Sequence, residues 1–311
     1  MNIIGPDFLV FGVDDVAACS EYFLAYGLQA VDVDARGGAF VALDGTGIII
    51  RHRGDPTLPQ ALSTGNPLRQ QIYGVRSAAD VDAIEAELSK DRRVVRLADG
   101  SIETQDNLGF ELKFQVTIRR QLDLPAEKIN SPGAPAQRGA NEIGVWEQMP
   151  AQPRTLSHLV LFVPDMDAAL DFYCRRLGFL VVDTLIGAGP FLRPQGNDDH
   201  HTLFFIRTPD YMQGCEHLAF HMRGPTELLL AGTRFVKAGY QSFWGPGRHK
   251  YGSNWFWYFN SPLGCHVEYD ADMDKHDESW EPRATQVGAE ASQIFLFQHR
   301  EKWFPSGGPS A

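Results

Sequence analysis

The sequence is poor in three features that would fix its class at once: paired cysteines, long apolar runs and an excess of positive charge. It has four cysteines, Cys19, Cys174, Cys215 and Cys265. They form no Cys-x-x-Cys pair, which argues against a disulfide scaffold and a zinc ribbon. No stretch approaches the roughly 18–20 apolar residues that span a bilayer, and the first residues lack the basic and apolar segments of a secretion signal. We therefore expect a cytoplasmic protein without a membrane partner.

The charge balance is acidic, with 28 Lys and Arg against 39 Asp and Glu and a formal net charge of −11. A field of this sign repels a polyanion such as DNA, so we expect no nucleic-acid partner. The 311 residues exceed the size of one ordinary core, and 43% hydrophobic with 22% charged residues is typical of a folded globular chain. Length and composition together predict two domains.

A proline- and glycine-rich stretch divides the chain into two parts of similar size. Five prolines lie between Leu124 and Pro153, and prolines remove the backbone donors that a sheet needs. We therefore predict four parts: an N-terminal domain over 1–123, a connector over 124–153, a C-terminal domain over 154–271 and an extension over 272–311. The last residues, 304–311, are rich in Pro, Gly and Ser and are expected to fray.

A strand–helix–three-strand pattern recurs four times along the chain, twice in each half. In the second half, the β-rich run at 157–163 precedes apolar residues at helical spacing between Asp165, a good N-cap, and Gly178, a good helix stop. A second strand-like run at 216–220 precedes a helix near 225–238. The repeat predicts an α+β fold of four βαβββ modules, paired into two domains, each a curled mixed sheet around a cavity.

Seven of the ten histidines lie between positions 158 and 266. His158 and His217 take the same place in successive modules, so pseudo-symmetric packing would bring them together. Glu268 lies in the last strand-like run, where an unpaired carboxylate costs several kcal/mol of desolvation. Two imidazoles and one carboxylate make the facial triad of non-haem iron(II) sites. Separate, satisfied polar residues would give the same spacing, so the residues alone leave both interpretations open.

The spacing of His217 and His221 also matches the His-x-x-x-His pattern of zinc peptidases. Those enzymes need a general-base glutamate directly after the first histidine. Here that position is Leu218, and the segment has the pattern of a strand. We therefore do not expect a zinc peptidase.

Four segments of the second half carry a more specific pattern, at 157–165, 200–203, 216–220 and 247–269. In the last one, the spacing Tyr-x-x-x-Pro-x-Gly-x-x-x-Glu-Tyr is intact, and a histidine precedes the first tyrosine by nine residues. These segments resemble the type I extradiol ring-cleaving dioxygenases of the vicinal oxygen chelate superfamily, which includes glyoxalases and bleomycin resistance proteins. The architecture of the whole chain fits that family, while the residue-level match is confined to 157–269.

The resemblance implies a role for each matching residue. His158, His217 and Glu268 correspond to the metal ligands, with Fe(II) as the expected metal, Mn(II) as the less expected one and O2 as co-substrate. His201 corresponds to the acid/base, and His249 and Tyr258 to the residues that hydrogen-bond the bound diol and the oxygen species.

Three other histidines receive no assigned role. Successive side chains of an extended segment point to opposite faces, so only one of His200 and His201 can address the metal. The family pattern, a histidine directly before Thr, Ser or Asp, favours His201, and His200 is set aside. His221 and His266 are left out of the site, although His266 shares a strand face with Glu268.

The N-terminal half departs from the ligand pattern. Its matching positions are Asp7, Gln71 and Lys113. A protonated ammonium cannot bind iron, so we expect this half to be metal-free, as the family's one-metal pattern implies.

The resemblance implies an extradiol dioxygenase that opens a catechol-type ring next to the diol and gives a muconic semialdehyde-type product. Two alternatives stay open: a hydroquinone-type ring-cleaving dioxygenase, and a non-catalytic aromatic-binding protein of the same superfamily. The intact His201, His249 and Tyr258 argue against a pure binder, which needs no acid/base set. Aromatic residues between Trp244 and Phe259 suit either an aromatic ligand or a core. We expect a homo-oligomer, as is common among soluble enzymes.

Overall fold

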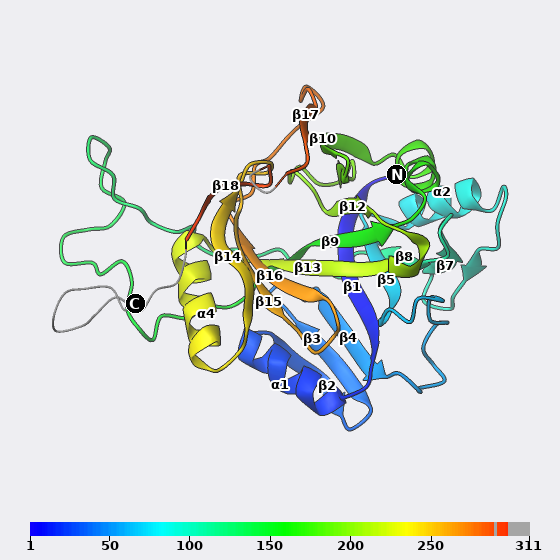
Figure 1. Cartoon of the computed structure of the whole chain (residues 1–311), viewed down its shortest axis with the longest axis horizontal. Coiled ribbons are helices and arrows are strands. Elements are labelled where there is room, and N and C mark those ends of the chain that lie inside the picture. Colours follow the sequence, from blue (N-terminus) through cyan, green and yellow to red (C-terminus); the bar gives the residue numbers. More distant parts are fainter. Residues whose placement is uncertain (289–290, 298–311) are drawn as a thin grey trace.

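The computed structural model describes residues 1–288 and 291–297 and contains two large mixed sheets with few helices (Figure 1). Within the described residues, the first sheet has eight strands and the second has ten. Among the described residues, no helix is both long enough and apolar enough to cross a bilayer. The expected α+β class and its four βαβββ modules are confirmed.

The N-terminal half contains the first two modules. The first consists of β1 (Ile3–Val13), α1 (Val16–Tyr26), β2 (Gln29–Asp34), β3 (Gly37–Val41) and β4 (Gly47–His52). The second consists of β5 (Leu68–Val75), α2 (Ala78–Leu88), β6 (Val95–Arg96), β7 (Ile102–Gln105) and β8 (Glu111–Val116).

The C-terminal half contains the other two modules and two added strands. The third module consists of β9 (Thr155–Val163), α3 (Met166–Leu170), the π-helical turn η1 (Asp171–Arg176), β10 (Leu180–Ile186), β11 (Gly189–Arg193) and β12 (Leu203–Arg207). After the short helix η2 (Asp210–Met212), the fourth consists of β13 (Gly214–His221), α4 (Pro225–Lys237), β14 (Ser242–His249), β15 (Trp255–Asn260) and β16 (His266–Ala271). The extension adds β17 (Arg283–Gln286) and β18 (Gln293–Leu296).

All four modules share one pairing pattern. The first strand of each module pairs in parallel with its last strand, as β9 does with β12 and β13 with β16. The first strands of the two modules in a half then pair antiparallel, β1 with β5 and β9 with β13. This pairing places β9, β13 and β16 side by side in the second sheet.

Local signals explain where the third helix begins and ends. The Asp165 side chain accepts a hydrogen bond from the backbone N–H of Ala168 at 3.0 Å, which is the geometry of an N-cap. Gly178 ends the turn with φ +78°, a conformation that favours glycine. Between them the expected regular helix widens into η1, where Arg176 forms ion pairs with Glu87 and Asp91 of the N-terminal half.

Apolar packing continues from one half into the other. The ring of Tyr26 in α1 stacks on Tyr269 in β16 with centroids 3.9 Å apart, and both belong to a single large core cluster. Residues 117–154, all of them described, contain no helix or strand. The predicted domain boundaries at 123, 153 and 271 stay a prediction.

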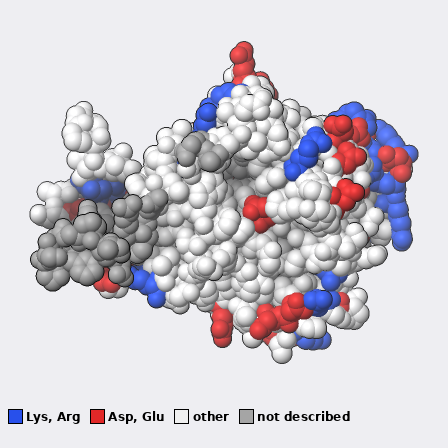
Figure 2. Space-filling model, viewed as in Figure 1, with Lys and Arg blue, Asp and Glu red and all other residues white. Residues whose placement is uncertain are grey.

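The extension adds one strand to each edge of the second sheet. β17 pairs with β10 at one edge, and β18 pairs with β14 at the other. The expected frayed end at 304–311 lies outside the described residues. On the face shown in Figure 2, acidic side chains lie beside basic ones around the rim, and the middle carries few charges.

Candidate metal centre

The strand register brings His158, His217 and Glu268 to one face of the second sheet. His158 in β9 pairs with Ala219 in β13, and Ala219 pairs with Glu268 in β16. His217 precedes Ala219 by two residues, and side chains two residues apart lie on the same face of a strand. Three neighbouring strands therefore present one polar side chain each to the same point.

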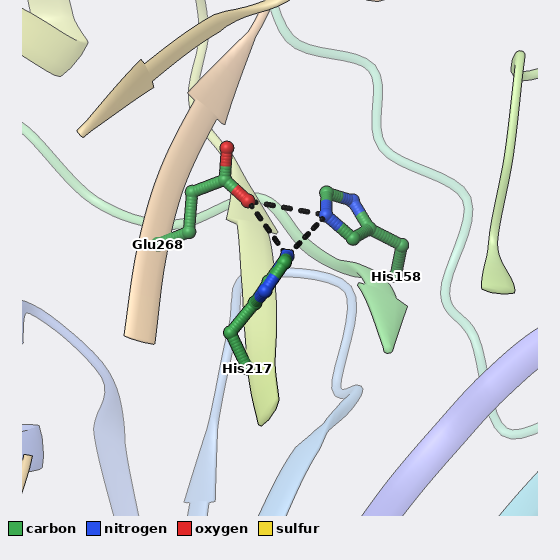
Figure 3. Close-up of side chains that lie close together, drawn as sticks. All are labelled: His158, His217 and Glu268. Atoms are coloured by element: carbon green, nitrogen blue, oxygen red, sulfur yellow. Dashed lines mark hydrogen bonds and ion pairs between the residues drawn. The ribbon is translucent and has the colours of Figure 1, made fainter. Parts of the chain in front are cut away.

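The three side chains meet at hydrogen-bonding distance (Figure 3). Nε2 of His158 lies 3.3 Å from Nε2 of His217 and 3.1 Å from Oε2 of Glu268, and Nε2 of His217 lies 3.4 Å from the same oxygen. Their exposed fractions are 1%, 6% and 0%. Donors held at about 2.1 Å and at right angles around one cation lie about 3 Å apart. The spacing of these atoms fits a facial metal triad.

The carboxylate of Glu268 supplies an independent test of that fit. It is fully buried, and neither of its oxygens has a hydrogen-bond partner of good geometry among the described residues. A buried carboxylate in this state is costly unless a cation faces it. The observed donor set therefore suits a divalent metal ion.

The electrostatics of the site also favour positive charge. Burial alone would raise the pKa of Glu268, but the facing imidazoles of His158, His249 and His217 hold it below its ordinary value. Burial would lower the pKa of His158, yet Asp270 and Glu268 raise it to about 9. Two buried carboxylates thus attract a cation to the point where Nε2 of His158 lies.

A cavity of about 350 Å³ opens onto this cluster. His201, His249 and Tyr258 line it together with the two cluster histidines. Nδ1 of His249 donates to the carbonyl oxygen of Ser292 at 2.8 Å, which leaves Nε2 to accept from the hydroxyl of Tyr258 at 3.1 Å. Burial and the nearby Glu268 raise the pKa of Tyr258 well above 10. The structure thus brings together all six residues that the sequence singled out.

Comparison with known families agrees with this geometry. Residues 155–269 match the family model described as Glyoxalase/Bleomycin resistance protein/Dioxygenase superfamily. These residues form a domain of that superfamily. The superfamily domain contains the whole cluster and every cavity residue except those that the extension adds.

Individual relatives cover different shares of the chain. Metapyrocatechase 2 of Cupriavidus necator is 36% identical over 150 residues, which is 48% of this chain and 45% of that protein. The alignment therefore spans less than half of this curated relative. A Mn(II)-bound glyoxalase from Novosphingobium aromaticivorans superposes with a TM-score of 0.72 at 21% identity, over 94% of this chain and 90% of the other. A halotolerant catechol dioxygenase superposes with a TM-score of 0.71 at 17% identity, over 99% and 97%. At these identities the structural likenesses establish the fold.

Behind His158, a buried hydrogen-bond chain orients the ring. The Ser157 hydroxyl donates to Asp270 at 2.9 Å, so Nδ1 of His158 must donate to the same hydroxyl, also at 2.9 Å. The nitrogen left to bind a metal is therefore Nε2, which must give up its proton to do so. Nδ1 of His221 lies 2.7 Å from Asp270. This histidine, which the sequence analysis left out of the site, therefore holds the carboxylate that begins the hydrogen-bond chain to His158.

Behind His217 stands Glu216, a residue that the sequence reasoning missed. Its carboxylate accepts from Nδ1 of His217 and, at 2.9 Å, from Nδ1 of His266. Strand alternation would place Glu216 on the face opposite His217. A register shift between Cys215 and His217 marks a β-bulge there, and Glu216 lines the cavity. No local sequence signal announces that bulge.

The two adjacent histidines before β12 turn towards each other. Their Nδ1 atoms lie 2.9 Å apart, and only His201 lines the cavity, with its ring centroid 4.4 Å from that of His158. Strand alternation, the reason for expecting only one of them at the metal, does not apply, because the strand begins at Leu203. Burial, with smaller effects of the nearby histidines, lowers the pKa of His201 well below its ordinary 6.5.

The matching positions of the N-terminal half have separate partners. Asp7 accepts from Thr117 and Gln115 at 2.9 and 3.1 Å. The Gln71 amide oxygen accepts from the hydroxyl of Tyr73, and Lys113 forms an ion pair with Asp99. Among the described residues, the only cluster of ligand-type side chains close enough to hold a metal is the one in the superfamily domain.

Proposed function

We propose that the protein is an extradiol dioxygenase that uses Fe(II) and O2 to cleave a catechol-type ring next to the diol, giving a muconic semialdehyde-type product. The observation that carries this proposal is the buried cluster of His158, His217 and Glu268 at the end of a largely apolar cavity. The similarity to Metapyrocatechase 2, at 36% identity over 150 residues, supports it.

His158, His217 and Glu268 would hold the metal through Nε2, Nε2 and the carboxylate. Bound iron supplies adjacent open positions at which a diol and O2 can react. Both the Ser157–Asp270 chain and Glu216 orient the imidazoles, because each occupies Nδ1 and leaves Nε2 free. Mn(II) suits the same donors, and the iron assignment rests on the proposed oxygen chemistry.

Three cavity residues would handle protons around the substrate. Tyr258 and His249 share a hydrogen bond on the Glu268 side, where they can receive and hold the proton of a diol hydroxyl. His201 lies against His158 and is neutral near pH 7, so it can accept a proton at the opposite side and return it as the ring opens. Replacing His201 by Phe should retain iron and slow ring opening.

The proposed compartment and oligomeric state rest on less specific features. All four cysteines are free thiols, which supports a reducing cytoplasm as the compartment. We keep the homo-oligomer as part of the proposal because closed symmetric assemblies are common among soluble enzymes.

Anaerobic purification followed by iron assay and a substrate screen tests the proposal. We expect oxygen uptake and a yellow ring-fission product with a catechol. Cleavage of hydroquinones alone would contradict the catechol assignment and favour the related ring-cleaving reaction. Full iron occupancy without turnover of any catechol or hydroquinone would contradict the enzyme assignment and favour a binding protein.

A further inference from the structure

One wall of the cavity is a hydrophobic cluster that stands apart from the main core. Val160, Leu185, Phe204 and Tyr251 form this cluster, and Phe191 packs against it. All five line the cavity, and most come from the third module. The ring of Phe191 stacks on Phe204 at 4.1 Å and lies 5.0 Å from the ring of His201. The apolar wall therefore begins directly beside the acid/base candidate.

Among the described residues, the cavity offers no lysine or arginine to an anionic substituent. Its lining includes the carboxylate of Glu216 next to the metal cluster. A carboxylate attached to the ring would therefore lose its water without gaining a counter-ion, which is strongly unfavourable. An apolar substituent would instead bury its surface against the apolar wall.

We propose, on the basis of the proposed function, that the substrate is a catechol with an uncharged apolar substituent and that carboxylated catechols are excluded. The diol would face the metal cluster, and the substituent would lie between Phe191 and Leu185. The volume of about 350 Å³ is near the lower end of small-molecule sites, roughly 300–1,000 Å³. A single ring with a short alkyl chain matches that size.

The ligands 3-ethylcatechol and 2,3-dihydroxybenzoate have substituents of similar size but different charge. Comparing their binding therefore separates the effect of charge from the effect of size. Anaerobic titration of the iron-loaded protein should show 3-ethylcatechol binding about tenfold tighter than catechol, as two buried carbons imply, and about a hundredfold tighter than 2,3-dihydroxybenzoate. The values of kcat/KM should follow the same order. Equal binding of the charged and apolar ligands would overturn the inference. Binding in the expected order without cleavage of any of them would overturn the proposed function instead.

A pair of charge variants sharpens the test. Val287 lines the cavity, while its neighbour Ile186, joined to it by a backbone hydrogen bond, does not, and both are exposed. Val287→Lys should improve 2,3-dihydroxybenzoate binding about tenfold because it supplies the missing counter-ion. Ile186→Lys adds the same charge outside the cavity and should leave binding unchanged. An equal gain in both variants would contradict a local charge effect.

A second inference rests on a different set of contacts, a buried chain behind His201. Nδ1 of His201 lies 2.9 Å from Nδ1 of His200, and Nε2 of His200 lies 2.9 Å from Asp183 in β10. The Asp183 carboxylate also accepts from the backbone N–H and the guanidinium of Arg283 in β17, at 2.8 and 3.1 Å. His200 and Asp183 are fully buried. The extension is thus linked to the acid/base candidate.

The order of donors and acceptors fixes the position of each proton. A carboxylate only accepts, so Nε2 of His200 must carry the proton that faces Asp183. Nδ1 of neutral His200 is then an acceptor, and Nδ1 of His201 must donate to it. His201 is left with an unprotonated Nε2. The ring can therefore take up a proton at Nε2, the nitrogen that the chain leaves free.

The geometry points to Asp183 and Arg283 as positioning residues that hold His201 in its Nδ1–H tautomer. The functional consequence rests on the proposed function, whereas the tautomer can be measured without turnover. In Asp183→Asn the amide can donate to His200, which reverses the chain and moves the proton of His201 to Nε2. A reversal of this kind leaves the fold and the metal ligands in place but removes the proton acceptor.

Nitrogen-15 NMR of histidine-labelled, Zn(II)-loaded protein reports the tautomers directly. We expect His201 as Nδ1–H in the wild type and as Nε2–H in Asp183→Asn. For the iron enzyme, kcat should fall at least tenfold with KM nearly unchanged. Asp198 is a nearby exposed carboxylate that pairs with Lys275. The control variant Asp198→Asn should change neither the tautomer of His201 nor kcat.

Arg283→Gln provides a second variant, since the Arg283 side chain is 43% exposed and its loss should be tolerated. This substitution should weaken the hydrogen-bond chain behind His201 and lower kcat less than Asp183→Asn does. An Nε2–H tautomer in the wild type, or an Nδ1–H tautomer retained in Asp183→Asn, would overturn the positioning role. A changed tautomer in a protein that cleaves no catechol would overturn only the proposed function.

Discussion

At the scale of single residues, the site depends on side chains whose hydrogen-bond partners fix their orientation. Glu268 is buried and has no hydrogen-bond partner of good geometry in the part of the chain that the structure describes, and the two imidazoles beside it each have Nδ1 occupied. Each ring therefore points Nε2 at the carboxylate. The three ligands could be predicted from the repeat and from a motif of fixed spacing. Glu216 could not be predicted, because its place in the cavity depends on a bulge rather than on strand alternation.

Glu216→Gln tests the role of that carboxylate. An amide has one acceptor oxygen and cannot accept from both His217 and His266, so His217 should lose part of its orientation. Metal affinity, measured by competition with a chromophoric chelator, should fall about 10–100-fold. Glu278→Gln, an exposed acid that does not line the cavity, should leave it unchanged. Wild-type affinity in Glu216→Gln would show that Glu216 does not orient the ligand.

At the scale of elements, the βαβββ repeat could be predicted from alternating apolar patterns and turn residues, and the register of β9, β13 and β16 then fixes the site. Capping at Asp165 and termination at Gly178 could be predicted from residue type alone. The widening of α3 into η1 could not, because it accompanies ion pairs of Arg176 with residues of the other half. The two strands of the extension had no counterpart in the repeat.

Asp165→Ala tests the capping argument. Losing the hydrogen bond to the N–H of Ala168 should lower the free energy of unfolding by about 1 kcal/mol. Asp167→Ala removes an acid from the same first turn without removing the cap, and should cost less. Urea denaturation of the two metal-free variants measures the difference. Equal stabilities would show that the cap contributes nothing beyond its charge.

At the scale of the whole molecule, the halves are joined by contacts that no local pattern predicts. Tyr26 stacks on Tyr269, and the hydroxyl of Tyr173 donates to Asp106 across the two halves at 3.1 Å. Such contacts depend on how the modules are placed, so the sequence predicted two halves but not their shared core. The apolar wall of the cavity was missed for the same reason: its residues come from several strands and become a cluster only after folding.

Asp106 should make stability depend on pH. Burial raises the pKa of Asp106 from 3.8 to about 6, despite the backbone N–H groups of Leu108 and Phe110 and the Tyr173 hydroxyl that bond it. The folded state therefore binds a proton more tightly than the unfolded state, so this group stabilises the fold at low pH and loses that contribution as pH rises from about 4 to 6. The loss is on the order of 3 kcal/mol for a shift of this size.

Asp106→Asn removes the titration and keeps one acceptor oxygen for the backbone N–H groups of Leu108 and Phe110, while its amide nitrogen replaces the oxygen that faces the Tyr173 hydroxyl. The stability of the wild type relative to the variant should therefore fall as pH rises from 4 to 7, as measured by urea denaturation of metal-free protein. A difference between the two proteins that is constant over this range would contradict the burial argument.

The central claim is that one cation lies between His158, His217 and Glu268. Anomalous diffraction at the iron edge, from crystals of protein loaded anaerobically with Fe(II), tests it most directly. The account predicts one strong peak per chain, at about 2.1 Å from both Nε2 atoms and from a carboxylate oxygen of Glu268. A peak elsewhere in the molecule, or none at these three side chains in fully loaded protein, would contradict it.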